Sequence, residues 1–216
     1  TLEPLLDGPF LLFLGDIFFR TRDLKPMVEG VVSGTCNAAL AVKTDVPAAI
    51  SRNFAVEVND DGWVHRVIEK PAHPQTDMKG CGIYMFTPAI FDAVRRTPRT
   101  AMRDEYELTD SIQITIDSGY RVKAMDLIED DLNLTDATDL LNINLNELDR
   151  SGQDVVIDPS AEIHPEAKLS RTIVGPKAKI LTPAVISDSM IMPGAVVAEA
   201  GRLKSCIANE DRILHI

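Results

Sequence analysis

The sequence predicts two parts of different fold class: an α/β domain over residues 1–150, followed by a parallel β-helix over residues 151–216. Two observations predict this division. Up to about residue 150, apolar strand-like runs alternate with helical patterns, which is typical of a layered α/β domain. Beyond that point, aliphatic residues recur at short regular intervals between prolines, which is typical of a repeat fold. The polar stretch 149–153 contains the predicted boundary.

The first strand carries the first candidate site residue. A helix-like opening, residues 1–8, leads into the apolar run Leu11–Leu14, which predicts a strand buried on both faces of a parallel sheet. Gly15 lets the chain turn, and Asp16 then stands at the carboxyl end of the strand, where open α/β sheets bind ligands. A carboxylate in this place suits a hard divalent cation. The alternative is that Asp16 only caps the following segment.

The other elements of the α/β part follow from periodicity and turn signals. The hairpin signal Asn59–Gly62 separates two strand-like segments. In chain order, we predict a helix over 24–32, strands over 37–42, 54–58, 63–68 and 82–86, a helix starting at 89–94, a helix over 111–118, a strand over 121–125 and a helix over 138–148.

The β-helix prediction rests on a period of 17 residues. Aliphatic residues stand at 157, 163, 169, 174, 180, 186, 191, 197 and 203, so that they step by 6, 6 and 5. A small residue four positions after an aliphatic one suits the corner of a triangular coil. Five prolines between Pro159 and Pro193 exclude an α-helix over this stretch. The pattern resembles the hexapeptide repeat of the left-handed parallel β-helix, which has three faces per turn.

Composition argues against several classes of protein. The net charge of -11 argues against nonspecific binding to nucleic acid or to anionic membranes, although a pocket can still be locally basic. The sequence contains no run that is long and apolar enough to span a bilayer and opens with no signal peptide, so we expect a cytoplasmic protein. Its three separated cysteines, Cys36, Cys81 and Cys206, predict reduced structural thiols rather than a disulfide framework or a zinc site.

Two further segments carry candidate chemistry. Glu69 and Lys70 follow a strand: the carboxylate can accept sugar hydroxyls, and the ammonium can neutralise a phosphate. The alternative is a solvated charge pair in a loop. Asn133 stands between apolar residues, so its side chain faces away from them, and its oxygen could be a neutral metal ligand. The alternative is a turn or capping role, with Thr135 or Asp136 starting the next helix.

Six short motifs follow one another along the chain: LLFLGD, the DDG hairpin, IEKP, GIYMF, EYELTD and NLTDATDLLNIN. In this order and spacing they resemble the sugar-1-phosphate nucleotidylyltransferases, which form a nucleotide sugar and pyrophosphate from a nucleoside triphosphate and a sugar 1-phosphate. The resemblance covers nearly the whole chain. Many members of that family carry a C-terminal left-handed β-helix, which agrees with the repeat.

The resemblance implies a role for each matched residue. Asp16 and Lys70 are the implied catalytic residues, and Asp16 and Asn133 are the implied ligands of Mg²⁺. Glu69 would hold sugar hydroxyls, Lys70 would hold the sugar phosphate, and Gly82 would leave room beside the sugar. An oxygen of the sugar phosphate would attack the α-phosphorus of the nucleotide in line, a reaction that depends on positioning and charge neutralisation.

The match also has departures. The family's glycine-rich loop around the triphosphate has no counterpart in this sequence, whereas Asn133 stands where the family usually has aspartate but asparagine in some branches. Phe54 and Ala55 stand where a glycine near the sugar is common, so Phe54 would crowd the pocket. We therefore expect this chain alone to have little nucleotidyl transfer activity. It is either a fragment or processed form of a full enzyme, or a non-catalytic binding or assembly subunit of the family.

Two other expectations concern the repeat. A hexapeptide-repeat acyltransferase is a further alternative, with His164 as the base, although this histidine stands beside Pro165 in a coil corner and can equally be a plain exposed corner residue. We also expect a homo-oligomer, because coils of this kind often associate through flat faces and because unpaired strand edges favour self-association.

Overall fold

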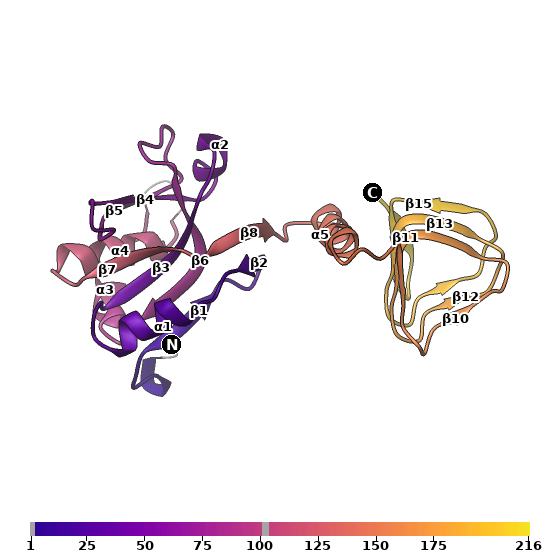
Figure 1. Cartoon of the computed structure of the whole chain (residues 1–216), viewed down its shortest axis with the longest axis horizontal. Coiled ribbons are helices and arrows are strands. Elements are labelled where there is room, and N and C mark those ends of the chain that lie inside the picture. The colour runs from indigo at the N-terminus through magenta and orange to yellow at the C-terminus, as the bar shows by residue number, and fades with distance from the viewer. Residues whose placement is uncertain (1–2, 101–103) are drawn as a thin grey trace. The chain divides into compact units, whose positions relative to one another are not determined.

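The computed structural model describes residues 3–100 and 104–216 and divides the chain into two compact units, Thr1–Asp131 and Leu132–Ile216 (Figure 1). The helix-like opening predicted from the sequence falls partly on residues 1 and 2, outside the described residues. Its remainder is a single 3-10 turn, η1 (Glu3–Leu5). In the part of the chain that the structure describes, no helix combines the length and the apolar character that a membrane crossing requires.

The first unit is built on a mixed six-stranded sheet with strand order β5-β4-β6-β3-β7, and β1 also pairs with β6. The β3–β7 pair is parallel, whereas β1–β6, β3–β6, β4–β6 and β4–β5 are antiparallel. Two more strands, β2 and β8, form a separate small sheet. The strands are β1 (Phe10–Phe13), β2 (Ile17–Thr21), β3 (Ala38–Thr44), β4 (Phe54–Val58), β5 (Val64–Glu69), β6 (Met78–Phe86), β7 (Val122–Asp126) and β8 (Ile128–Asn133).

The first strand differs from the sequence-based prediction. β1 pairs antiparallel with β6, and its side chains alternate between two environments. Phe10 and Leu12 pack on the core, whereas Leu11 and Phe13 are 39% and 47% exposed. The prediction of a parallel strand buried on both faces is therefore wrong. Burial of a strand depends on what covers each face, and a run of apolar residues does not specify that.

Helices cover both faces of this sheet, which confirms the predicted layered α/β architecture. Alternation along β3 sends Leu40 to one face, where Ile112 of α4 packs, and sends Ala39 to the other. Met27 and Val31 of α1 pack on that second face. The helices of this unit are α1 (Lys25–Val32), α2 (Pro47–Ile50), α3 (Ile90–Arg96) and α4 (Leu108–Asp117).

The second unit is a β-solenoid, and its strand register confirms the 17-residue period. Ile163 lies opposite Ile180, Ile180 lies opposite Val197, and Leu169 lies opposite Ile186, all in parallel pairs. These aliphatic side chains fill the inside of the coil. The strands are β9 (Val155–Ile157), β10 (Glu162–Ile163), β11 (Lys168–Val174), β12 (Lys179–Ile180), β13 (Val185–Ile191), β14 (Val196–Val197), β15 (Arg202–Lys204), β16 (Cys206–Ala208) and β17 (Ile213–His215).

One corner of the coil is a stack of residues in the left-handed backbone region. Arg171, Asp188 and Ser205 have φ angles of 44°, 49° and 50°, and they are one period apart. The Arg171 guanidinium holds this corner together, because it lies 2.7 Å from Asp149 Oδ2 and 3.1 Å from Asp188 Oδ1. The hydrogen bond from Arg171 lowers the pKa of Asp149 below its ordinary value.

Helix α5 (Ala137–Arg150) belongs with the solenoid. Leu141, Leu145 and Leu148 pack against Met190 and Ile207 of the coil. The division between the two units therefore lies before α5, whereas the sequence places it after this helix. The difference arises because the helical pattern of α5 continues the α/β periodicity, while its apolar side packs on the repeat.

The start of α5 agrees with the predicted cap. Asp136 is the N-cap residue, and its Oδ1 accepts hydrogen bonds from the backbone N–H groups of Thr138 at 2.7 Å and Asp139 at 3.0 Å. These bonds satisfy two of the amides that a helix start leaves without partners. They lower the pKa of the Asp136 carboxyl.

Two neighbouring residues of β13 allow a matched test of the coil interior. Ile186 is 0% exposed and Val185 is 37% exposed. We expect Ile186→Ala to lower the free energy of unfolding by about 2–5 kcal/mol, because it leaves a cavity in a packed core. Val185→Ala should cost less than about 1 kcal/mol, since that side chain is partly in water. Urea unfolding followed by circular dichroism measures both, and equal losses would contradict the assignment of Ile186 to the inside.

Candidate active site

The predicted site residues of the first unit gather along β6. β3 pairs with one edge of this strand, and both β4 and β1 pair with the other. β4 pairs with β6 at Lys79 and Gly80, and β1 starts pairing at Ile83, so Cys81 and Gly82 lie between two strand ends. The segment after β1 therefore lies next to Gly82 of β6, and the end of β5 lies one strand away, across Phe54 of β4 from Gly80.

Glu69 and Lys70 stand at the end of β5. Glu69 lies opposite Phe54 in the β4–β5 pair, and Lys70 follows it with a φ of 42°. Thr109 Oγ1, from the start of α4, donates a hydrogen bond of 3.2 Å to Glu69 Oε2. Glu69 Oε1 lies 3.8 Å from Lys70 Nζ, and the Lys70 side chain is 50% exposed. The arrangement presents an anchored carboxylate beside an ammonium that is accessible to a ligand.

Thr109 is a site residue that the sequence analysis did not single out. Its side chain is buried, and it reaches Glu69 from a helix that follows 40 residues later in the chain. The only signal in the sequence is the motif EYELTD, whose threonine falls on the first turn of α4.

Gly82 is required by the close approach of the chain after β1. Its φ is +77°, which favours glycine. A Cβ at this position would lie 3.0 Å from Leu14 Cδ1 and 3.1 Å from Ile17 Cδ1. The Leu14 N–H also donates to the Gly82 carbonyl at 3.0 Å. Gly82 thus fixes the turn that carries Asp16.

Asp16 itself is exposed in the turn between β1 and β2. Its carboxylate makes no hydrogen bond or ion pair with any residue that the structure describes. The alternative interpretation, that Asp16 caps the next segment, therefore lacks a capping bond, and the next segment is a strand. A carboxylate without a protein partner fits the requirement of a hard divalent cation for free oxygen ligands.

Asn133, the second predicted metal ligand, is the exposed last residue of β8 and belongs to the second unit. A cation shared by Asp16 and Asn133 therefore stays a prediction. Among residues 3–100 and 104–216, no group of three or more histidine, cysteine, aspartate or glutamate side chains is arranged to hold a metal ion.

Phe54 is packed into the sheet rather than projecting freely. Its ring lies over Gly80, where a Cβ would come within 1.8 Å of Phe54 Cζ. The ring also stacks on Tyr84 at a centroid distance of 6.3 Å. Burial, with the nearby Glu69 carboxylate as a smaller cause, raises the pKa of Tyr84. Gly80 thus provides the space that the Phe54 ring occupies.

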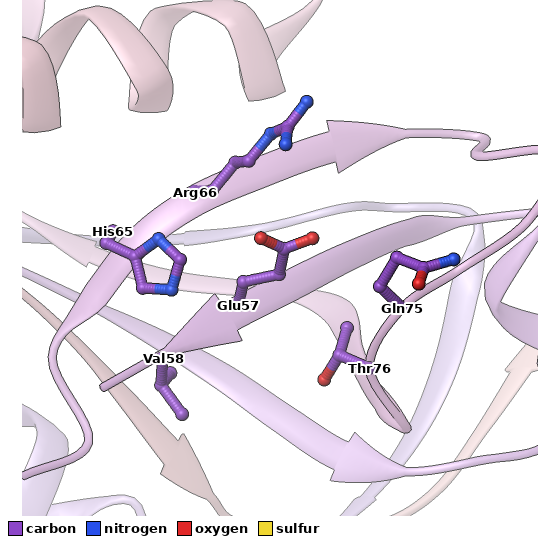
Figure 2. Close-up of a pocket in the computed structure, with 6 residues that line it drawn as sticks. All are labelled: Glu57, Val58, His65, Arg66, Gln75 and Thr76. Carbon is purple, nitrogen blue, oxygen red and sulfur yellow. The ribbon is translucent and has the colours of Figure 1, made fainter. Parts of the chain in front are cut away.

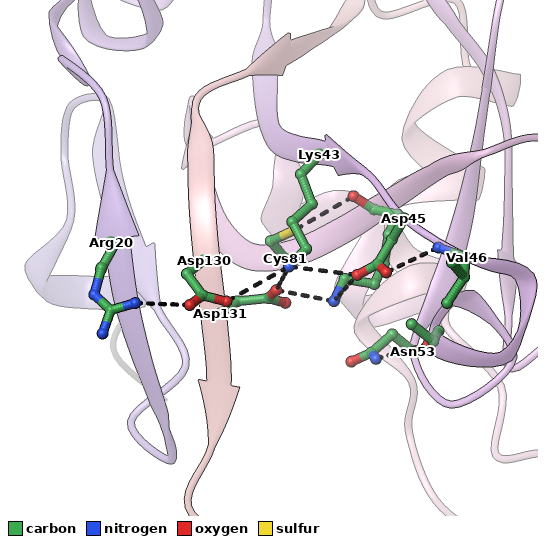
Figure 3. A network of polar contacts seen from close by, with 10 residues as sticks. Arg20, Lys43, Asp45, Val46, Asn53, Cys81, Asp130 and Asp131 are labelled. Carbon is green, nitrogen blue, oxygen red and sulfur yellow. Dashed lines mark hydrogen bonds and ion pairs between the residues drawn. The ribbon is translucent and has the colours of Figure 1, made fainter. Parts of the chain in front are cut away.

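A network of buried charges, which the sequence analysis did not predict, lies where β3, β6 and β8 meet (Figure 3). Lys79 Nζ lies 2.9 Å from Asp45 Oδ2 and 2.9 Å from Asp131 Oδ1. Lys43 Nζ lies 2.7 Å from the same Asp131 oxygen. The side chains of Lys79 and Asp131 are only 5% and 2% exposed, so each charge depends on the others for compensation.

The network also determines the protonation of its members. Burial is the largest single influence on Lys43 and disfavours its charged form, but the hydrogen bonds to Asp131 and Asp45 and the attraction of their charges together raise the Lys43 pKa. Burial is likewise the largest single influence on Asp45 and opposes its ionisation, but the hydrogen bonds from Lys79 and the Val46 backbone and the charges of Lys79 and Lys43 together lower the Asp45 pKa. Both groups therefore stay charged over the physiological range.

An ion pair extends the network to the small sheet. Arg20 Nη1 of β2 lies 2.7 Å from Asp130 Oδ2 of β8 (Figure 3). Because Asp131 follows directly, β8 is tied both to β2 and to the main sheet. β2 begins at Ile17, directly after Asp16. The Arg20–Asp130 ion pair therefore fixes the strand that follows the candidate cation ligand.

Removing one buried cation tests the network. We expect Lys79→Met to lower the free energy of unfolding of the first unit by about 3 kcal/mol, because Asp45 and Asp131 lose a shared partner. Urea unfolding followed by the fluorescence of Trp63, the only tryptophan, measures this. Lys25→Met, at an exposed helix position, is the control and should change it by less than about 0.5 kcal/mol.

The same variant should show a characteristic pH dependence. The Asp45 pKa lies below its ordinary value, so its contribution to stability is present above that value and is lost as the pH falls through the lowered pKa. The difference between the wild type and Lys79→Met should therefore shrink in acid. A difference that stays constant down to the acid transition would show that Asp45 is not stabilised by Lys79.

Comparisons with known proteins identify the family of the chain. Residues 3–145 match the family model described as "Nucleotidyl transferase". The glucose-1-phosphate thymidylyltransferase of Streptomyces antibioticus is 29% identical over 194 residues, 90% of this chain and 53% of that protein. The enzyme of the same name from Streptomyces griseus is 30% identical over 203 residues, with the same two shares covered. This chain thus spans about half the length of these curated relatives.

A solved structure shows the same fold. A UDP-glucose pyrophosphorylase in complex with UDP-glucose superposes with a TM-score of 0.60 and 18% identity, covering 69% of this chain and 60% of that one. Because the family model matches well over half of the sequence, the chain belongs to the nucleotidyl transferase family and carries a β-solenoid after the matched α/β unit.

Proposed function

We propose that this protein serves in nucleotidyl transfer to a sugar 1-phosphate, with release of pyrophosphate. The observation that carries the proposal is the pair formed by Glu69 and Lys70, an anchored carboxylate next to a half-exposed ammonium. Glu69 lies opposite Phe54 of β4, and Phe54 lies opposite Gly80 of β6, two residues before Gly82, whose carbonyl accepts a hydrogen bond from the chain just before Asp16. Family membership and the names of the relatives, glucose-1-phosphate thymidylyltransferases, support this substrate class.

In this proposal Glu69 and Lys70 divide the recognition of the sugar phosphate. The Glu69 carboxylate can only accept hydrogen bonds, so it takes sugar hydroxyls, and Thr109 keeps it in place. The Lys70 ammonium neutralises the phosphate as a point charge. Gly82 contributes indirectly: the space beside its Cα is taken by Leu14 and Ile17, so it admits the turn that carries Asp16. The phosphate oxygen then forms a bond to the α-phosphorus of the nucleotide while the bond to the departing pyrophosphate breaks.

We further propose Asp16 and Asn133 as ligands of Mg²⁺. The exposed, unpartnered carboxylate of Asp16 fits such an ion, and an amide oxygen at Asn133 is a neutral, weaker ligand. Bound Mg²⁺ would supply charge neutralisation for the nucleotide phosphates. In a protein of net charge -11, such compensation matters wherever two anions must approach each other.

The activity of this chain by itself is a separate question. No glycine-rich phosphate loop occurs in the sequence of 216 residues, so we propose that the sugar-phosphate half of the site is functional while turnover by this chain alone is slow. A role as a binding or assembly subunit remains the alternative, and self-association stays a prediction.

The acyltransferase alternative has weaker support. His164 Nδ1 accepts a hydrogen bond of 3.2 Å from the Glu166 backbone N–H at a coil corner. Such a hydrogen bond within a turn is typical of a structural residue at a coil corner, and it occupies the Nδ1 atom of the imidazole. We therefore do not extend the proposal to acyl transfer.

Binding of glucose 1-phosphate tests the role of Lys70. We expect Lys70→Met to weaken binding at least about tenfold, or ~1.4 kcal/mol, because the phosphate loses its cation. Lys25→Met is the matched control and should bind like the wild type. Isothermal titration calorimetry measures the affinity. Equal affinities for all three proteins would remove Lys70 from the phosphate site.

Pyrophosphate release tests Asp16. With dTTP or UTP, glucose 1-phosphate and Mg²⁺, we expect a rate far below the typical enzymatic range of roughly 1–10³ s⁻¹. We expect Asp16→Asn to abolish whatever rate is present, whereas Asp23→Asn, at another exposed acid of this unit, should leave it unchanged. A fully active Asp16→Asn protein would exclude Asp16 as a metal ligand, and wild-type turnover in the enzymatic range would refute the expectation of low activity.

A further inference from the structure

A cavity opens in the first unit where two strands of the sheet diverge. β4 pairs with β5 along its whole length but with β6 only at Phe54 and Ala55. Beyond these residues, the segment that connects β5 to β6 lies beside β4. The cavity between them has a volume of about 420 Å³, within the range of small-molecule sites. It is lined by Glu57, Val58, His65, Arg66, Gln75 and Thr76 (Figure 2).

The lining is polar and contains charges that the protein does not pair. Glu57 and Arg66 are direct cross-strand partners, yet neither forms an ion pair with the other or with any described residue. Figure 2 shows Glu57 between the two β5 side chains and the two side chains of the connecting segment. Opposite charges at such positions normally stabilise a sheet by contacting each other. Here both remain available to a third group.

The neighbouring polar groups are held in place by the backbone. Thr76 Oγ1 accepts a hydrogen bond of 3.1 Å from the Met78 N–H, and Gln75 Nε2 donates one of 3.0 Å to the His73 carbonyl. These bonds orient the two side chains at the wall of the cavity and leave the Gln75 amide oxygen as an acceptor. Val58 is the only apolar side chain of the lining, so an apolar ligand would gain little here.

We propose that this cavity is a binding site for a small oxyanion that also carries hydroxyl groups, a phosphorylated or carboxylated polar metabolite. The planar guanidinium of Arg66 suits a phosphate or a carboxylate, which it can bind in bidentate fashion. Glu57 only accepts hydrogen bonds, so it selects a ligand that has hydroxyl donors next to the anion. The site is separate from Glu69 and Lys70, although β5 carries residues of both.

Four probes separate the contributions to binding. Ribose 5-phosphate and glucuronate carry sugar hydroxyls with a phosphate or a carboxylate, inorganic phosphate lacks sugar hydroxyls, and glucose lacks charge. In ¹H–¹⁵N correlation spectra of the full chain, we expect the first two to shift the amide signals of Arg66, Gln75 and Thr76 saturably. The tighter of the two identifies the anion. Glucose should shift none of these signals.

Two variants and one control assign the contacts. Arg66→Gln should weaken the better probe at least about tenfold, or ~1.4 kcal/mol, while Lys70→Met should leave its affinity unchanged. Glu57→Gln should bind inorganic phosphate at least as tightly as the wild type does, because a negative charge is removed. The variant should no longer bind the hydroxyl-bearing probe more tightly than inorganic phosphate. Neither side chain forms a hydrogen bond or ion pair with a described residue, so neither substitution removes one, and the dispersion of the amide signals in the same spectra reports whether each variant is folded.

Three results would overturn the proposal. The first is the absence of saturable shifts at these amides with every probe. The second is wild-type affinity in Arg66→Gln. The third is a loss of affinity in Lys70→Met that equals the loss in Arg66→Gln, because this would place the probe at the proposed sugar-phosphate site. Failure of Lys70 to bind glucose 1-phosphate, in contrast, would leave the cavity untouched.

Discussion

The candidate active site depends on one long strand. β6 is nine residues long, and its length lets β4 and β1 pair with the same edge one after the other. The backbone between the two contact regions carries Gly82, whose missing side chain admits the turn with Asp16. A shorter β6 would offer no common support for that turn and for the Glu69 end of β5. The arrangement of the site is thus a result of strand pairing, and the site residues themselves contribute little to it.

Local signals predicted much of the fold. The turn Asn59–Gly62 specifies the β4–β5 hairpin by its own chemistry, and the 17-residue period specifies the register of the coil, because both depend on residues that are close in sequence. The burial of β1 could not be read in this way, since it depends on a partner strand some 70 residues later. The sequence of α5 likewise does not show that this helix packs on the solenoid, because the contacts are made with Met190 and Ile207, far along the chain.

The candidate site shows the same limit. The motifs around Asp16, Glu69 and Lys70 point to chemistry because acids and a lysine follow strands directly. The sequence did not predict the Thr109–Glu69 contact or the Lys79–Asp131 ion pair. The two residues of each pair are 40 and 52 positions apart, and nothing in the local sequence distinguishes them from other polar residues. Burial decides what the same residue types do: the buried charges around Lys79 compensate one another, whereas the exposed carboxylate of Asp16 has no hydrogen bond or ion pair with any described residue.

The strand β17 has a consequence for the outer edge of β16. The pairs β9–β11, β11–β13 and β13–β16 are parallel, but β17 turns back and pairs antiparallel with β16, Ile207 facing Leu214. The backbone groups along this edge of β16 are therefore already hydrogen-bonded within the chain. An extended segment of another protein could pair with β16 there only by displacing β17.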